Sequence, residues 1–328
     1  MTAHELVVEA WRSGFLESVH HGSLVALDAS GDVAVQLGEA SEPMFPRSSN
    51  KPMQALAMLR HGLDLDHELL ALACASHSGE GFHIAGVRRI LERAGLGPEQ
   101  LQCPEDLPIG EAALRAHLAA GGDKTRVHMN CSGKHSAMLL TCVINGWPVD
   151  TYRDPGHPLQ QAIQCAIEEL TGEAVAATGV DGCGAPLYAV SLLGLARAFG
   201  KLGAAPEGTL QRRIADAMRA HPEWVGGSGP ERIDSTLMKR LPGVIAKDGA
   251  EGVSAVGLPD GGAVAVKIAD GAARARPVTV VAALRRLRVP GADSLDDLAS
   301  TPVKGCGEQV GSVRPAGRLA QEPAAATV

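Results

Sequence analysis

The alternation of hydrophobic and polar residues gives both ends of the chain strand character. Two of the strand-like runs are joined by Asp28-Ala29-Ser30-Gly31 and two by Pro259-Asp260-Gly261-Gly262, which are typical turn sequences. The runs cover 6–12, 23–27, 33–37, 253–257 and 263–269. We therefore expect strands from both chain ends to share one antiparallel sheet.

The middle of the chain instead repeats hydrophobic residues every three or four positions, which predicts helices. These segments cover 52–63, 84–94, 111–120, 135–143, 158–170, 187–199 and 210–220, and Pro277 opens a last helix to about residue 288. The predicted fold class is α/β (α+β), with a sheet domain of 1–50 plus 240–314 and an inserted, mainly helical domain of 51–239. We expect a cleft where the two meet and a flexible tail over 315–328.

Composition and charge narrow the function classes. The net charge of -7 provides no basic field for phosphates, so nucleic acid is not expected as a partner. No apolar run reaches the roughly 20 residues of a spanning helix, and residues 1–6 lack the apolar stretch of a signal peptide. We therefore expect no membrane partner and a cytoplasmic location. The seven scattered cysteines are expected to be thiols or metal ligands.

Ser48 and Lys51 form the sharpest local feature, in Arg47-Ser48-Ser49-Asn50-Lys51-Pro52. Proline belongs in the first turn of a helix, so Ser48 lies at the helix start and Lys51, three residues later, shares its face. A neutral lysine can activate a serine hydroxyl, but at a pKa of about 10.4 only on the order of one lysine in two thousand is neutral at pH 7. Burial and a second cation are needed. The alternative is a helix cap followed by a solvated lysine.

Lys247 is the candidate for that second cation. It lies in Ala246-Lys247-Asp248-Gly249, directly before the returning strands, and Gly249 leaves room for a ligand. Lys-x-Gly on a strand beside a Ser-x-x-Lys helix is typical of serine acyl transferases of the β-lactamase type. The alternative is an exposed lysine on an edge strand, which fits Lys267 better.

Two further stretches carry candidate chemistry. The loop Ser76-His77-Ser78-Gly79-Glu80 can present the Ser78 hydroxyl and backbone N–H groups to a substrate, or Ser78 can cap the following helix while Glu80 anchors the loop. Cys131 and Cys183 each lie among small residues before a helical segment, where the dipole favours a thiolate. They indicate either an incomplete tetrahedral zinc site or tightly packed turns.

Together these motifs resemble the L-asparaginase II family, the rhizobial type, over roughly residues 5 to 314. The motifs that carry the resemblance are Arg12-Ser13-Gly14, Glu17-Ser18-Val19-His20, Ser48-x-x-Lys51-Pro52, Ser76-His77-Ser78-Gly79-Glu80, Asn130-Cys131-Ser132-Gly133-Lys134-His135, Asp181-Gly182-Cys183-Gly184 and Ala246-Lys247-Asp248-Gly249. The resemblance implies hydrolysis of L-asparagine to L-aspartate and ammonia on a serine β-lactamase-like and glutaminase-like fold, usually as a homodimer.

The resemblance also implies residue roles. Ser48 is the expected nucleophile with Lys51 as partner, and Ser78 with Lys247 forms a second serine–lysine pair. The implied zinc ligands are Cys131, Lys134 and Cys183, with zinc as a modulator and not the group that breaks the bond.

The charged ends of an amino-acid substrate need partners. Arg47 or Lys247 is expected to bind its α-carboxylate. The sequence does not decide which group binds the α-ammonium, and the candidates are Glu17, Glu80, Asp181 and zinc-bound water. Two other readings stay open at this point: a β-lactam or D-Ala-D-Ala hydrolase, and a non-catalytic zinc or amino-acid sensor on the same fold.

Overall fold

The computed structural model describes residues 4–321 and contains an eight-stranded antiparallel sheet. Its strands follow the order β10-β11-β1-β2-β9-β8-β7, and β3 pairs with β2 outside this path. Their bounds are β1 (Glu5–Arg12), β2 (Phe15–Leu27), β3 (Val33–Leu37), β7 (Ile245–Asp248), β8 (Val253–Gly257), β9 (Ala263–Ile268), β10 (Thr301–Gly305) and β11 (Glu308–Pro315). Strands β2 and β9 pair from Gly22 opposite Ile268 to Leu27 opposite Ala263, so the expected sheet from both chain ends is confirmed.

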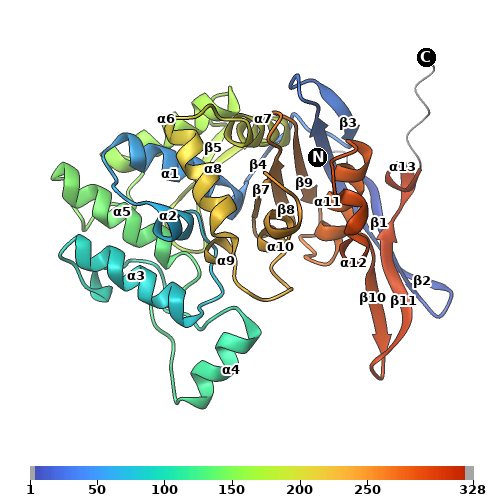
Figure 1. The fold of residues 1–328 in the computed structure, drawn as a ribbon, viewed down its shortest axis with the longest axis horizontal. Coiled ribbons are helices and arrows are strands. Elements are labelled where there is room, and N and C mark those ends of the chain that lie inside the picture. The colour runs from blue at the N-terminus through green and yellow to red at the C-terminus, as the bar shows by residue number, and fades with distance from the viewer. Residues whose placement is uncertain (1–3, 322–328) are drawn as a thin grey trace.

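Helices cover both faces of this sheet (Figure 1). Helix α11 (Ala275–Arg286) lies on one face and α7 (Leu192–Gly203) on the other. Every residue of β8 is buried as a result, as expected for a strand covered on both sides. Gly203 lets α7 approach closely, because a Cβ there would lie 2.5 Å from the Leu258 carbonyl oxygen.

The inserted segment between β3 and β7 is mainly helical. Its helices are α1 (Lys51–Arg60), α2 (His67–Ala73), α3 (Gly81–Arg93), α4 (Glu111–Ala119), α5 (Ser132–Asn145), α6 (Pro158–Thr171), α7, α8 (Leu210–Ala220), α9 (Pro222–Val225) and α10 (Ile233–Arg240). Its small second sheet has the order β4 (Pro43–Met44), β6 (Pro186–Ser191), β5 (Ala177–Val180). Residues 51–59 of α1 are all buried, which makes α1 the central helix of this part, whereas α4 buries none and protrudes.

The predicted helix over 187–199 is wrong in its first part. Residues 186–191 form the fully buried strand β6, and α7 begins only at Leu192, where the Ser191 hydroxyl accepts a hydrogen bond from the Gly194 backbone N–H. An apolar run buried on all sides has no period that separates strand from helix, and Tyr188 and Val190 favour the strand.

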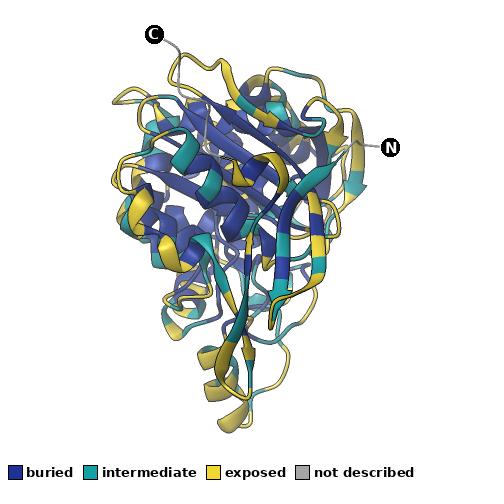
Figure 2. Cartoon of the chain, turned by 90° about the vertical axis from the view of Figure 1, so that its right-hand side faces the viewer, coloured by how far each residue is buried: buried dark blue, intermediate teal, exposed yellow. Residues whose placement is uncertain are grey.

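Burial is highest at the centre of the molecule and lowest at its hairpins and at α4 (Figure 2). After α11 the chain forms α12 (Asp296–Ala299), then β10, β11 and α13 (Gly317–Ala320), where Leu319 is buried. The expected flexible tail over 315–328 thus includes ordered residues up to 321, and 322–328 lie outside the described residues. Between residues 4 and 321, no helix combines the length and apolarity that crossing a membrane requires.

Candidate active site

Lys51 is buried at the start of α1, directly after the short 3-10 turn η1 (Arg47–Asn50). Its Nζ donates hydrogen bonds to the Ala75 carbonyl oxygen, to Ser76 Oγ at 2.9 Å and to Cys131 Sγ at 3.1 Å. These contacts join α1 to the loop after α2 and to the start of α5. Among residues 4–321, no hydrogen bond of Lys51 Nζ leads to Ser48.

Ser48 lies on the turn that precedes Lys51. The Lys51 backbone N–H donates to the Ser48 carbonyl oxygen, so the two residues belong to one helical turn, and Ser48 stays partly exposed. Its neighbour Ser49 is buried and donates its hydroxyl to the Pro46 carbonyl oxygen at 2.7 Å. Ser48 therefore presents the accessible hydroxyl of this turn, and its role as nucleophile stays a prediction.

Ser76 is the hydroxyl group that the sequence did not single out. It lies in the predicted loop, but the loop offers two serines flanking one histidine, and sequence alone favoured Ser78. Ser78 instead donates its hydroxyl to the Gly226 carbonyl oxygen at 2.9 Å, and the Glu80 carboxylate accepts from the Ser228 backbone N–H at 2.8 Å. Both side chains thus attach the loop to residues 226–228.

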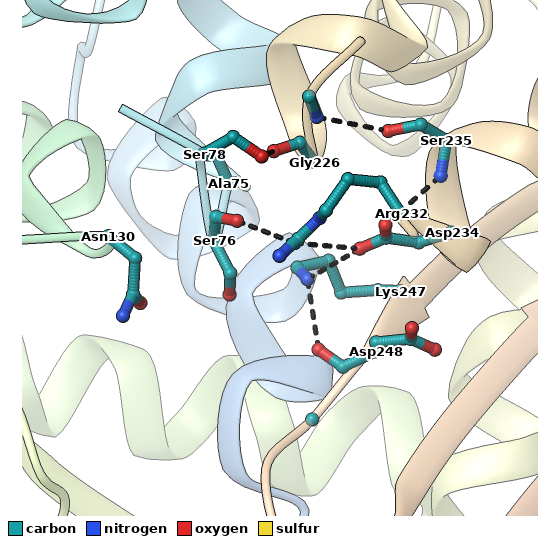
Figure 3. Close-up of polar contacts among 12 residues, drawn as sticks. Ala75, Ser76, Ser78, Asn130, Gly226, Arg232, Asp234, Ser235, Lys247 and Asp248 are labelled. Carbon is teal, nitrogen blue, oxygen red and sulfur yellow. Dashed lines mark hydrogen bonds and ion pairs between the residues drawn. The ribbon is translucent and has the colours of Figure 1, made fainter. Parts of the chain in front are cut away.

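Lys247 is completely buried on β7 and forms an ion pair that the sequence did not indicate. Its Nζ lies 2.9 Å from Asp234 Oδ2 and donates to the Asp248 carbonyl oxygen at 2.9 Å (Figure 3). Arg232 lies on the other side of Asp234, with Nη2 at 3.9 Å from Asp234 Oδ2. The same Nη2 donates to the Ser76 carbonyl oxygen at 2.6 Å. In the part of the chain that the structure describes, no hydrogen bond joins Lys247 to Ser78.

The surroundings of Lys51 favour its neutral form. Burial is the largest effect and lowers the pKa of Lys51, and the Lys247 and Lys134 cations lower it further, against the opposing effect of Cys131. This agrees with the requirement for burial and a second cation. The Ser76 hydroxyl, at 2.9 Å from the Lys51 amine, is placed to exchange a proton with it or to orient it.

Cys131, Lys134 and Cys183 converge at the start of α5. Lys134 Nζ donates to Cys183 Sγ at 3.1 Å, and contact with Cys131, followed by the charges of Lys134 and His135, lowers the pKa of Cys183 against the effect of burial. Burial lowers the pKa of Lys134, but the negative charges of Cys183, Cys131 and Asp181 outweigh that effect and raise it above its usual value. Two sulfur donors and an amine are ligands that zinc accepts once the amine loses its proton, so these residues fit the zinc that the family resemblance implies. No three His, Cys, Asp or Glu side chains within 4–321 are arranged to hold a metal ion, so a site here depends on Lys134 as third donor.

Arg47 and Asp181 form an ion pair beside Ser48. Arg47 Nε lies 2.8 Å from Asp181 Oδ1, with 23% and 11% of the two side chains exposed. Gly249 lies against the same turn, because a Cβ at Gly249 would be 2.5 Å from the Pro46 carbonyl oxygen. Of the residues expected to bind substrate, Arg47 precedes Ser48 on the turn, Asp181 pairs with Arg47, and Gly249 lies against the turn, whereas Glu80 is engaged with Ser228.

Comparison with solved structures shows similarity at low sequence identity. A beta-lactamase from Mycobacterium bovis is 16% identical with a TM-score of 0.46, over 81% of this chain and 94% of that chain. A beta-lactamase from Burkholderia vietnamiensis is 17% identical with a TM-score of 0.33, over 77% and 85%. EstCE1, a hydrolase with promiscuous acyltransferase activity, is 12% identical with a TM-score of 0.35, over 80% and 88%.

No curated protein matches the chain. The family model described as L-asparaginase II matches residues 8–315, which span the sheet, the helical insertion and every residue of the site above. The chain therefore belongs to the L-asparaginase II family.

Proposed function

We propose that this protein hydrolyses the side-chain amide of L-asparagine to L-aspartate and ammonia through an ester on a serine. The observation that carries the proposal is the buried Lys51, whose Nζ contacts Ser76 Oγ at 2.9 Å one turn after the accessible Ser48. A base of this kind serves amide hydrolysis, because the same nitrogen can take a proton from the nucleophile and return it to the departing amine.

In the first step Ser48 Oγ attacks the amide carbon and Lys51 Nζ takes the hydroxyl proton. The carbon–nitrogen bond then breaks, and Lys51 passes the proton to the departing nitrogen, which leaves as ammonia. In the second step water attacks the ester carbon, Lys51 takes the water proton, and the proton returns to Ser48 Oγ as aspartate leaves. The Lys247 charge in the buried cluster favours the oxyanion of both steps.

We assign the second hydroxyl of the proposal to Ser76 in place of Ser78. Ser76 Oγ contacts Lys51, whereas the Ser78 hydroxyl is donated to Gly226. Ser76 then orients the Lys51 amine. Asp181, held by Arg47, is the carboxylate assigned to the substrate α-ammonium, because it is partly exposed beside Ser48.

Zinc is part of the proposal, with Cys131, Lys134 and Cys183 as its ligands. Bound there, it would supply a Lewis acid that orients the substrate. The homodimer and the cytoplasmic location stay predictions.

The test compares Ser48→Ala, Ser76→Ala and Ser49→Ala for ammonia release from L-asparagine. Loss of the nucleophile is expected to lower kcat by at least about 1000-fold. Loss of Ser76 is expected to lower kcat by roughly 10- to 100-fold, as for a group that orients a base. Ser49→Ala is the matched control, since among residues 4–321 its hydroxyl bonds only the Pro46 carbonyl oxygen.

Mass spectrometry of acid-quenched reactions identifies the ester. An aspartyl adduct on Ser48 supports the mechanism, and an adduct on Ser76 with full turnover in Ser48→Ala contradicts it. A nitrocefin assay run in parallel separates an asparaginase from a β-lactam hydrolase. If the wild-type protein binds asparagine but releases no ammonia from it, the protein is a sensor of amino acids and the proposed hydrolysis is wrong.

A further inference from the structure

Arg232 lies beside Ser76 and Lys247, and one of its N–H donors is not used in a hydrogen bond within residues 4–321. Its Nη2 donates to the Ser76 carbonyl oxygen at 2.6 Å, but its Nε is buried and has no hydrogen-bond partner among residues 4–321. Buried polar groups are nearly always paired, and a charged one is costly to leave unpaired. About 15% of the Arg232 side chain is exposed, so the side chain borders solvent through atoms other than the buried Nε.

The charges around Arg232 do not balance. Lys247 and Arg232 are two cations that share the single carboxylate of Asp234, with Lys247 and Asp234 completely buried (Figure 3). Uncompensated charge in a protein interior is strongly unfavourable, so this cluster calls for one further anion.

The neighbouring carboxylates are engaged elsewhere. Asp248 lies 3.7 Å from Arg276 and accepts a hydrogen bond from the Ser254 hydroxyl at 2.8 Å. Glu80 accepts from the Ser228 backbone N–H and forms no ion pair with Arg232 within the described residues. Neither carboxylate supplies the missing charge.

The two cations expected from sequence to bind the substrate carboxylate already hold carboxylates of the protein. Arg47 is paired with Asp181 at 2.8 Å, and Lys247 with Asp234 at 2.9 Å. Arg232 differs from both, because its carboxylate contact is long, at 3.9 Å, and its Nε has no acceptor in the described part of the chain.

We infer that Arg232 binds the α-carboxylate of the amino-acid substrate, which supplies the anion that the Lys247–Asp234–Arg232 cluster lacks. The assignment rests on the proposed amidase function and adds the residue that selects free α-amino acids. Arg232 also donates to the Ser76 carbonyl oxygen. A carboxylate bound to its guanidinium therefore lies at a fixed position relative to Ser76, whose hydroxyl contacts Lys51.

The test pairs variants with a substrate that lacks the carboxylate. Wild type, Arg232→Gln, Arg232→Lys and Arg47→Gln are assayed for ammonia release from L-asparagine and from 3-aminopropanamide, which is asparagine without its α-carboxylate. We expect Arg232→Gln to lower kcat/KM for asparagine by about 10- to 100-fold, the effect of one charged hydrogen bond, mainly through KM. For 3-aminopropanamide we expect a much smaller loss, limited to the effect of losing the contact between Arg232 and the Ser76 carbonyl oxygen. Arg232→Lys, which keeps the charge but not the fork of donors, should fall between.

Arg47→Gln is the matched comparison, because Arg47 is a second partly buried arginine at the same site and should leave the ratio of the two substrates unchanged. The assignment is overturned if Arg232→Gln slows both substrates equally, which marks a structural role, or if Arg47→Gln is the variant that removes the preference for asparagine. If the wild type releases ammonia from neither amide, the proposed function fails and this assignment fails with it. If the wild type hydrolyses asparagine and Arg232→Gln keeps its substrate ratio, only the assignment fails.

Discussion

The ion pair between Asp234 and Lys247 predicts a large loss of stability on replacing Asp234 by asparagine. The substitution keeps the shape of the side chain but leaves the ammonium of Lys247 without its counter-charge at a position with no exposed area. Removing one partner of a buried ion pair costs about 3–5 kcal/mol, because the remaining charge stays buried and unpaired. We expect the free energy of unfolding of Asp234→Asn to fall by that amount at pH 7.

The pH dependence of this effect has a definite sign. Burial raises the pKa of Asp234, but the Lys247 and Arg232 cations outweigh it and hold the pKa below its ordinary value. A carboxyl whose pKa is lower in the folded state stabilises the fold above its unfolded value, and the contribution disappears as the pH falls through the folded value. The difference between wild type and Asp234→Asn is therefore complete at neutral pH and shrinks only in strong acid.

Urea unfolding of wild type, Asp234→Asn, Lys247→Met and the double variant measures the coupling. The double variant removes both charges and is expected to recover most of the loss, because two neutral side chains can be buried without a counter-charge. A loss below about 1 kcal/mol in Asp234→Asn at pH 7, or a double variant as unstable as the sum of the two single changes, would refute the reasoning.

Three further predictions test the reacting groups. Lys51→Arg replaces the base by a permanent cation, so kcat should fall by at least about 1000-fold. In the wild type, kcat/KM should rise with pH around a midpoint below 10.5, because the pKa of Lys51 is lowered, and a midpoint at or above 10.5 contradicts the assignment of Lys51 as base. Gly249→Ala places a Cβ 2.5 Å from the Pro46 carbonyl oxygen, which displaces the Ser48 turn and should lower kcat/KM by roughly tenfold or more. Gly81→Ala is the control, because its Cβ meets no atom within 4 Å and kcat/KM should stay unchanged. Metal analysis should find zinc in the wild type and in Cys165→Ser, whose thiol is exposed, but not in Cys183→Ser; equal zinc in all three would exclude the proposed ligands.

Much of the fold follows from local patterns in the sequence. Strand β8 has the predicted bounds 253–257 and helix α8 the predicted bounds 210–220, because turn residues mark the ends of one and a strong hydrophobic period marks the other. Strand β6 was missed because its residues are buried on both faces, which removes the alternation on which the prediction depends.

Site residues that lie close together in the sequence can be predicted from their spacing, whereas residues brought together by the packing of distant elements cannot. Lys51, Cys131 and Lys134 belong to short motifs at helix starts, and the structure brings their side chains together with Cys183. Cys183 does not precede a helix as predicted, because it lies in the turn between β5 and β6. Ser76 and Ser78 are equivalent in the sequence, and only the path of their loop decides that Ser76 faces Lys51. Asp234 carries no motif, since its contact with Lys247 is set by how α10 packs against β7.

The pairing of β2 with β9 also determines the order in which the site is completed during synthesis. Gly22 pairs with Ile268, so the central sheet cannot close until nearly all of the chain has been made, and contacts so distant in sequence form slowly. Lys51 and Ser76 belong to the part of the chain that leaves the ribosome early, while Lys247 arrives later on β7, the strand next to β8. Lys247, which follows the buried Lys51 and Lys134 in the sequence, therefore takes its place only as the sheet closes, and until then its charge does not contribute to lowering the pKa of Lys51.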